Sequence, residues 1–141
     1  MSTDDTPRLA ESLSTELRHI VMLLRRTTAG QPVTAQQYSV LGSLEALPRR
    51  MSELAEEHGV QLPTMSVQIN RLEDAGLVAR GFDASDARVR TVELTSEGRS
   101  RLHAVRQARV AYLSDRLDRL TPEEREAIAA ALPALAKLGR G

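Results

Sequence analysis

Hydrophobic residues change their spacing several times along the chain, and each change indicates a new structural element. Near the N-terminus, apolar residues recur at steps of four and three: Leu9, Leu13, Leu17, Ile20 and Leu24. This spacing places them on one face of a helix. We predict that the helix begins at Pro7 and ends near Ala29 and Gly30.

Three shorter helices are predicted next. Thr34 begins a capping-box pattern, so the second helix should start here and continue through Leu47, where Pro48 stops it. A third helix fits Ser52 to His58, and a fourth follows at once and ends before Gly76. Two short helices in such close succession are a helix-turn-helix candidate.

After the fourth helix the pattern becomes extended. Residues 77–82 and 88–94 are short segments with β-branched residues, and residues 83–87 between them have the composition of a loop. We therefore predict a β-hairpin. The hairpin is followed by a capping threonine, Thr95, which should begin a long helix.

A last helix should begin at Thr121, where the sequence Thr-Pro-Glu-Glu combines a capping box with a proline in the first turn. Pro133 should kink or shorten it. The predicted fold is mainly α with a small β-hairpin wing (α+β): a winged helix-turn-helix lobe flanked by long helices. In one domain, 1–141, the lobe covers 34–94 and the flanking helices cover 7–30 and 95–138.

The composition limits what such a fold can do. A chain of 141 residues with 41% hydrophobic residues can bury a core of its own, and zero cysteines exclude disulfides and thiolate metal sites. Aromatic residues, at 2%, are too few for a platform that stacks single-stranded nucleic acid. The 19 basic and 19 acidic residues cancel, so an anionic partner must meet a local patch. No stretch approaches the ~20 apolar residues of a membrane span, and we expect a cytoplasmic protein.

Residues 52–98 contain a series of short motifs: Ser52-Glu53-Leu54-Ala55, Pro63-Thr64-Met65-Ser66, Arg71-Leu72-Glu73, Gly76-Leu77-Val78, Asp86-x-Arg88 and Leu94-Thr95-x-x-Gly98. In their order and spacing these motifs resemble the MarR family of bacterial transcription regulators. The resemblance implies a homodimer, joined through its N- and C-terminal helices, whose two winged-helix lobes bind inverted-repeat double-stranded DNA. The apolar stripes of the first helix and of the last two helices also favour a dimer, because one small lobe cannot cover them.

The fourth helix has two distinct faces. Met65, Ile69 and Leu72 share one face and should pack in the core. The opposite face of such a helix enters the major groove in helix-turn-helix proteins. Its candidate DNA contacts, including two residues between the faces and one at the flank, are Thr64, Ser66, Val67, Gln68, Asn70 and Arg71.

These side chains suit base recognition, although a merely solvated face is the alternative. Gln68 can pair with adenine, the methyl groups of Thr64 and Val67 suit thymine, and Arg71 can reach guanine or a phosphate. Val67 departs from the family, because many members have a basic residue there. Gln61 departs as well, because many members have a polar capping residue there, so the helix should start less sharply.

The predicted hairpin supplies a second set of contacts. Arg88 resembles the arginine that enters the minor groove in the family, and Asp86 would hold its guanidinium by a charge-assisted bond. Arg90 is a candidate phosphate contact. The alternative is an exposed ion pair without function. Residues 48–92 hold six arginines and seven acids, so the lobe is not basic overall. If it binds DNA, five of these acids must point away from the phosphates: Glu53, Glu56, Glu57, Glu73 and Asp74.

The family resemblance also implies an effector pocket where the long helices meet the lobe. Its candidate residues are Arg18, Met22, Arg25, Tyr38 and Tyr112, and the effector implied is a small anionic aromatic or phenolic compound. The alternative is that both tyrosines are core residues with a solvated hydroxyl and both arginines are surface charges.

Other functions fit the sequence poorly. No nucleophile elbow, phosphate-binding loop or metal dyad is present, so we expect no enzyme. His19, His58 and His103 are too scattered for metal ligands, and we expect no metal and no cofactor. The remaining alternative is a winged-helix dimer that acts as a protein-interaction module without DNA binding. Steep salt dependence and two lobes one duplex turn apart, ~34–36 Å, distinguish a DNA reader from such a module.

Overall fold

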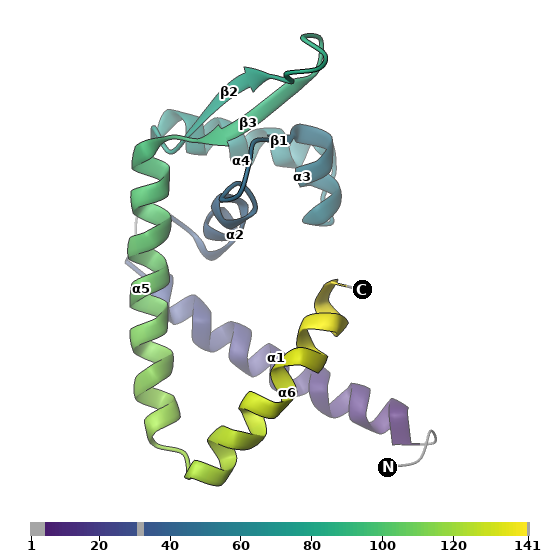
Figure 1. Ribbon diagram of the computed structural model, residues 1–141, viewed down its shortest axis with the longest axis vertical. Helices are drawn as coiled ribbons and strands as arrows, with labels where there is room; N and C mark the ends of the chain where they lie inside the picture. The colour runs from purple at the N-terminus through teal and green to yellow at the C-terminus, as the bar shows by residue number, and fades with distance from the viewer. Residues whose placement is uncertain (1–4, 31–32, 141) are drawn as a thin grey trace.

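The computed structural model describes residues 5–30 and 33–140, and its elements follow the predicted order (Figure 1). The helices are α1 (Thr6–Thr28), α2 (Ala35–Ser43), α3 (Met51–Glu57), α4 (Leu62–Asp74), α5 (Ser96–Asp118) and α6 (Pro122–Arg140). The strands are β1 (Arg49–Arg50), β2 (Val78–Phe82) and β3 (Arg90–Leu94). A mainly helical chain with a small antiparallel sheet confirms the predicted winged-helix fold class.

Local sequence signals begin α2 and α6 and end α4 as predicted. Thr34 accepts a hydrogen bond from the Gln37 amide at 3.1 Å, and the Thr34 amide donates to the Gln37 side chain at 3.0 Å. The same reciprocal pair joins Thr121 and Glu124 at 2.9 and 3.2 Å before α6. The α4 helix ends before Gly76, whose φ of 78° is readily adopted only by glycine.

The second helix is shorter than predicted. It ends at Ser43, and the buried side chain of Leu44 follows it as the C-cap residue, whereas Leu47 is exposed. The apolar pattern extends beyond the helix because Leu44 packs into the core from the turn. Pro133, in contrast, does not shorten α6, which continues to Arg140. Since α6 is exposed, water can bind the carbonyl that loses its partner at the proline.

The hairpin belongs to a three-stranded antiparallel sheet in the order β1-β3-β2. Strands β2 and β3 pair from Val78 with Leu94 to Phe82 with Arg90, as the predicted hairpin requires. Strand β1 was not predicted, because two consecutive arginines carry no strand pattern. It pairs Arg49 with Val92 and Arg50 with Thr91, and so covers only part of β3.

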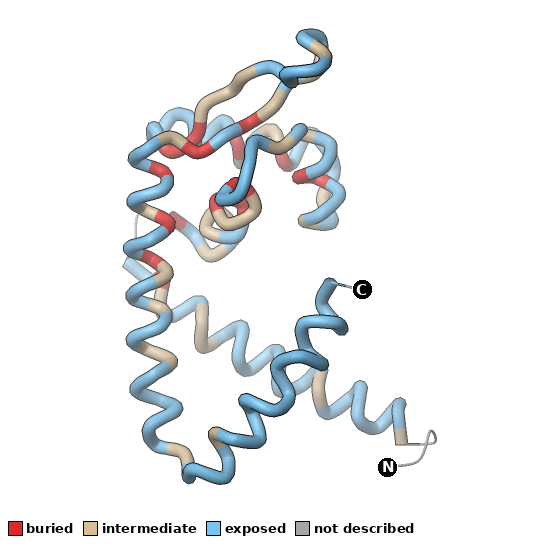
Figure 2. Tube along the Cα trace, in the orientation of Figure 1, coloured by how far each residue is buried: buried red, intermediate tan, exposed pale blue. Residues whose placement is uncertain are grey.

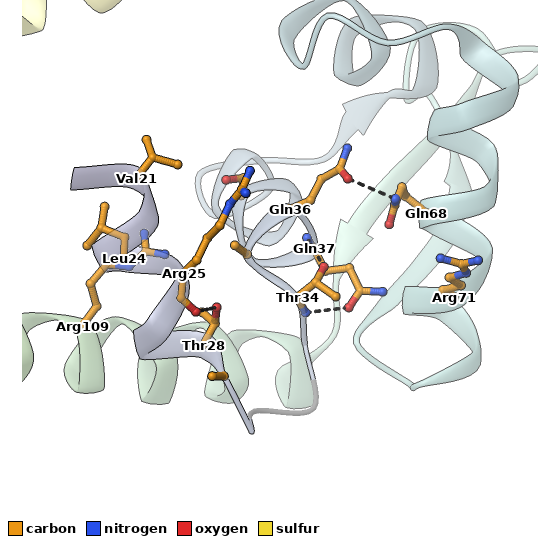
Figure 3. A pocket seen from close by; sticks show the side chains of 13 residues that line it. Val21, Leu24, Arg25, Thr28, Thr34, Gln36, Gln37, Gln68, Arg71 and Arg109 are labelled. Atoms are coloured by element: carbon orange, nitrogen blue, oxygen red, sulfur yellow. Dashed lines mark hydrogen bonds between the residues drawn. The ribbon is translucent and has the colours of Figure 1, made fainter. Parts of the chain in front are cut away.

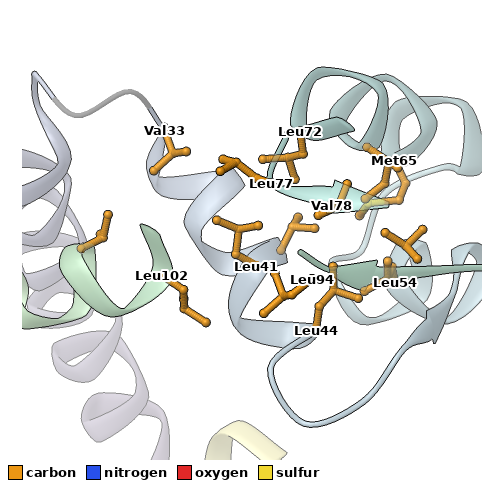
Figure 4. Packing of buried hydrophobic residues seen from close by; sticks show 14 of the residues in the cluster. Val33, Leu41, Leu44, Leu54, Met65, Leu72, Leu77, Val78, Leu94 and Leu102 are labelled. Carbon is orange, nitrogen blue, oxygen red and sulfur yellow. The ribbon is translucent and has the colours of Figure 1, made fainter. Parts of the chain in front are cut away.

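One hydrophobic core fills the inside of the lobe and includes side chains from the adjacent part of α5 (Figure 4). It takes side chains from every lobe helix, from the hairpin and from α5, among them Leu41, Leu54, Met65, Ile69, Leu72, Val78, Val92 and Leu102. The predicted inner face of α4 is therefore confirmed. Figure 2 shows that the buried residues concentrate in this region.

The long helices outside the lobe have no core of their own. No described residue of α6 is buried, and Thr28 is the one buried residue of α1. Large apolar side chains are instead exposed on both: Leu9, Leu17, Ile20, Val21, Met22, Ile128, Leu132, Leu135 and Leu138. The apolar stripes of α1 and α6 therefore remain uncovered in a single chain. No helix in the described ranges is long and apolar enough to cross a bilayer.

Gly98 allows α5 to begin directly against the hairpin. A Cβ atom at this position would lie 1.9 Å from the carbonyl oxygen of Leu77, which is backbone and cannot rotate away. We predict that Gly98→Ala lowers the free energy of unfolding by about 3 kcal/mol, measured by urea denaturation. Gly42→Ala is the matched control, because its Cβ would meet nothing within 4 Å. It should be neutral or stabilising by up to about 1 kcal/mol; equal effects of both substitutions would contradict the prediction.

Candidate nucleic-acid interface

The outer face of α4 is open to solvent. Thr64, Val67, Asn70 and Arg71 are exposed, and Ser66 and Gln68 are half-buried at its edges. Gln61 caps the helix without a side-chain hydrogen bond, and Pro63 occupies the first turn. The helix is thus oriented by its buried face, and its outer face is open to another molecule.

Several α4 side chains already have partners in the lobe. Arg80 of β2 donates a hydrogen bond to the Asn70 side chain, and its Nε lies 3.5 Å from the Glu73 carboxylate. Gln68 donates to Gln36 of α2 at 3.4 Å. Arg71 forms no ion pair with any residue that the structure describes. Arg71 is therefore the available positive charge on this face.

The hairpin loop holds the predicted pair of Asp86 and Arg88. The aspartate accepts hydrogen bonds from the backbone amide of Arg88 at 3.0 Å and from its Nε at 3.1 Å. These bonds, the side-chain one first, lower the pKa of Asp86. The Arg88 side chain remains 91% exposed. Arg90 lies over the Phe82 ring, 5.6 Å from its centre. Both candidate cations of the wing therefore reach solvent.

A second aspartate of the loop is bound more extensively. Asp83 accepts from the Ser85 hydroxyl at 2.6 Å and the Ser85 amide at 2.8 Å, and Arg50 of β1 donates to it at 3.0 Å. These partners, the Ser85 hydroxyl first, lower the pKa of Asp83 to about 2. The Asp-x-Ser pattern is a recognisable turn signal. The contact with Arg50 has no local signal in the sequence and was not predicted.

Arginines also neutralise several acids of the lobe. Glu57 lies 3.0 Å and Glu53 3.7 Å from Arg49, while Glu73 faces Arg80 as described above. Glu56 and Asp74 form no ion pair within the described parts of the chain. Most charges of the described lobe thus form local pairs, whereas Arg71 and Arg90 and the acids Glu56 and Asp74 lie outside them.

A polar bridge attaches the lobe to α5. Glu45, in the turn after α2, binds Arg106 through both carboxylate oxygens at 2.7 and 3.0 Å, and Arg99 donates to its carbonyl at 3.1 Å. The hydrogen bond between Arg106 and Glu45 lowers the pKa of Glu45 and raises the pKa of Arg106. The Tyr38 hydroxyl also raises the pKa of Arg106. The bridge adds a fixed orientation to the apolar packing between α2 and α5.

A cleft of about 790 Å³ opens where α1, α2, α4 and α5 meet (Figure 3). It is lined by Val21, Leu24, Arg25, Thr28, Ala29, Thr34, Ala35, Gln36, Gln37, Ser39, Gln68, Arg71 and Arg109. Three arginines and no carboxylate are among these residues. Arg109 lies over the Tyr38 ring, 4.3 Å from its centre, and its buried Nε has no hydrogen-bond partner among the residues that the structure describes. The cleft therefore offers positive charge beside an apolar wall.

The structure brings only some of the predicted pocket residues together. Arg25 lines the cleft, and Tyr38 lies behind Arg109 against the core. Met22 lines a separate hollow of about 180 Å³ with His19, Leu23 and Arg26. Arg18 and Tyr112 line neither space. The Tyr112 hydroxyl instead accepts a hydrogen bond from Arg116 at 3.0 Å, which lowers its pKa.

The three histidines occupy different elements. His58 Nε2 lies 2.9 Å from the Ser43 hydroxyl, and His19 lies 3.6 Å from Glu16. No three potential metal-ligating side chains of the His, Cys, Asp or Glu type come together in the parts of the chain described.

The fold, with an outward-facing fourth helix and a projecting hairpin, defines a winged helix-turn-helix protein. A sequence profile described as MarR family matches residues 31–89. An uncharacterized HTH-type transcriptional regulator of Mycobacterium bovis is 32% identical over 130 residues, which are 91% of this chain and 90% of the relative. The chain belongs to the MarR family of DNA-binding transcriptional regulators, which are not enzymes.

Solved structures agree with this assignment over nearly the whole chain. The crystal structure of RV1404 from Mycobacterium tuberculosis matches with a TM-score of 0.84 and 25% identity, covering 99% of this chain and 95% of its own. The transcriptional repressor CouR, bound to a 23-mer DNA duplex, matches with a TM-score of 0.73 and 27% identity, covering 96% and 98%.

Proposed function

We propose that this protein is a cytoplasmic repressor that binds an inverted-repeat operator as a homodimer. The observation that carries the proposal is the solvent-exposed face of α4 with Thr64, Val67 and Arg71, joined in one lobe to a hairpin that exposes Arg88. A helix of this kind reads base edges in the major groove, and an arginine at a wing tip suits the minor groove. The DNA complex of the related repressor CouR supports this use of the fold.

The uncovered apolar stripes of α1 and α6 support the dimer. Side chains such as Ile20 and Leu132 are exposed on helices that have no core of their own. A second copy of the chain can cover both stripes through one twofold axis, which is the commonest symmetry of soluble oligomers. A dimer then carries two α4 helices, and inverted half-sites match its symmetry when they lie one helical turn, ~34–36 Å, apart.

The cleft between the lobe and the long helices suits a small anionic effector. Arg25, Arg71 and Arg109 supply charge, Val21 and Leu24 supply apolar contact, and no carboxylate repels an anion there. An aromatic carboxylate combines the two properties that this lining recognises. Gln68 and Arg71 line the same cleft, so an anion bound there competes for side chains that we assign to DNA.

The effector acts by favouring one arrangement of the lobes. Both α4 helices must meet successive major grooves, and the cleft lies where each lobe joins the long helices. A ligand that binds better to an arrangement with another spacing shifts the population away from the DNA-binding one. Release from the operator is the result.

Selection of bound sequences from random DNA tests the main proposal. We expect an inverted repeat with half-site centres about 10 bp apart, affinity that falls steeply with salt, and a dimer mass in sedimentation at micromolar protein. A monomer, or the absence of an enriched sequence together with salt-independent binding, would contradict the proposal. The latter result would favour a protein-interaction module.

Arg88→Ala tests the role of the wing. The substitution should weaken operator binding and reduce the slope of log affinity against log salt by about one for each lobe, because one counterion-releasing contact is lost. Arg119→Ala is the matched control, since Arg119 pairs with Asp115 at 3.1 Å near the far end of α5. An unchanged slope and affinity for Arg88→Ala in a gel-shift titration would remove the wing from the mechanism.

Calorimetric titration with benzoate tests the cleft. Benzoate should bind, whereas its neutral analogue benzamide should bind at least about tenfold more weakly, because only the carboxylate can use the arginines. Arg109→Gln should reduce the benzoate affinity, and Arg119→Gln, distant from the cleft, should leave it unchanged. Equal binding of both compounds, or no effect of Arg109→Gln, would contradict an anion site in this cleft.

A further inference from the structure

We propose that Asp83 is a positioning residue for DNA binding, whose ion pair with Arg50 fixes the wing relative to the helix-turn-helix. The inference rests on the DNA-binding function proposed above. The carboxylate of Asp83 lies at the end of the lobe that we assign to DNA and strengthens DNA binding, although the negative charge alone would repel phosphates.

The Asp83 carboxylate is held on both oxygens. Oδ2 accepts from Arg50 Nε and lies 3.0 Å from Arg50 Nη2, while Oδ1 accepts two hydrogen bonds from Ser85. Only 18% of the Asp83 side chain is exposed, in contrast to 91% of the Arg88 side chain in the same loop. Two nitrogens of one planar guanidinium against Oδ2, together with two hydrogen bonds to Oδ1, restrict the orientation of the carboxylate. The base of the loop therefore has a defined position.

Arg50 is itself fixed by the backbone. It pairs with Thr91 in the sheet and is the residue that precedes α3, where its amide donates to the Glu53 side chain at 3.2 Å. The ion pair thus links the wing loop to the first helix of the helix-turn-helix. It is a contact between two elements 33 residues apart in the sequence.

The outer part of the hairpin needs such a link. Strand β1 pairs with Thr91 and Val92, so beyond it the hairpin continues as one two-stranded pair, Phe82 with Arg90, and the loop that joins them. Phe82 is exposed and buries little surface there, and the hairpin projects from the lobe (Figure 1). Two-stranded hairpins are only marginally stable by themselves. The core therefore does not determine where the tip lies, and the Asp83–Arg50 pair does.

Asp83→Asn distinguishes positioning from simple charge repulsion. Asparagine keeps the size of the side chain and an oxygen for Ser85, but it loses the ion pair with Arg50. On the selected operator we expect binding to weaken by about three- to tenfold, and by no more than Arg88→Ala weakens it. If Asp83 only repels phosphates, the substitution strengthens binding instead. Unchanged or tighter binding would overturn the proposal.

Asp74→Asn is the matched control. Asp74 is an exposed carboxylate at the end of α4 without an ion pair among the described residues, so its substitution removes the same charge from the lobe. It should leave affinity unchanged or slightly increased. In an Arg88→Ala background, Asp83→Asn should change affinity by less than about twofold, because the residue it positions is already absent. An undiminished effect in that background would show that Asp83 does not act through the wing.

Hydrogen exchange gives a measurement that does not involve DNA. The amides of Asp83 and Val89, which donate to the carbonyls of Val89 and Asp86 at 2.9 and 3.0 Å, report on the loop. Both should exchange faster in Asp83→Asn than in the wild type or in Asp74→Asn, while core amides such as that of Ile69 remain protected. Unchanged loop exchange would overturn the positioning role. If the wild-type protein binds no DNA, the function proposed above fails whether or not the loop amides respond.

Discussion

The interface depends on the packing of one face of α4 against the lobe core. Met65, Ile69 and Leu72 are almost completely buried, and the helical repeat then necessarily directs Val67 and Arg71 outward. Rotation of α4 about its axis would expose apolar side chains and bury a guanidinium, and both changes cost free energy. The same core holds the inner ends of the hairpin strands. Hydrophobic packing therefore positions α4 and the base of the hairpin.

Local signals made most of the fold predictable. The helical periodicity of apolar residues predicted the buried face of α4. The capping boxes at Thr34 and Thr121 predicted two helix starts, because the groups that interact in a capping box lie within one helical turn. Strand β1 was missed because the sheet pairing that forms it is made with β3, far along the chain. The ion pairs of Asp83 with Arg50 and of Glu45 with Arg106 were not predicted for the same reason, since no spacing rule connects residues 33 or 61 positions apart.

The pocket was harder to predict than the outer face of α4. Neighbouring residues of a helix point about 100° apart, so Val21 lines the cleft while Met22 lines the other hollow. The family resemblance located the junction of helices but not the rotation of α1 within it. Arg25, one of the predicted pocket residues, does line the cleft. Arg109 was not predicted, because its relation to Tyr38 depends on how α2 packs on α5. Side chains on exposed helices have no core to indicate their direction.

The charge balance has a consequence for recognition. A guanidinium that is paired with a carboxylate and partly covered by the protein displaces few counterions from DNA, so Arg49, Arg50 and Arg80 add little to non-specific attraction. Arg88 is also paired, with Asp86, but its side chain is far more exposed and can still reach the DNA. Affinity in the proposed complex must therefore come from a few well-placed groups, such as Arg71 and Arg88, that meet their targets together. This requirement makes the directions of α4, the wing and α5 more important than the total charge. Polar contacts worth little in stability, such as the Glu45–Arg106 bridge, then matter because they fix those directions.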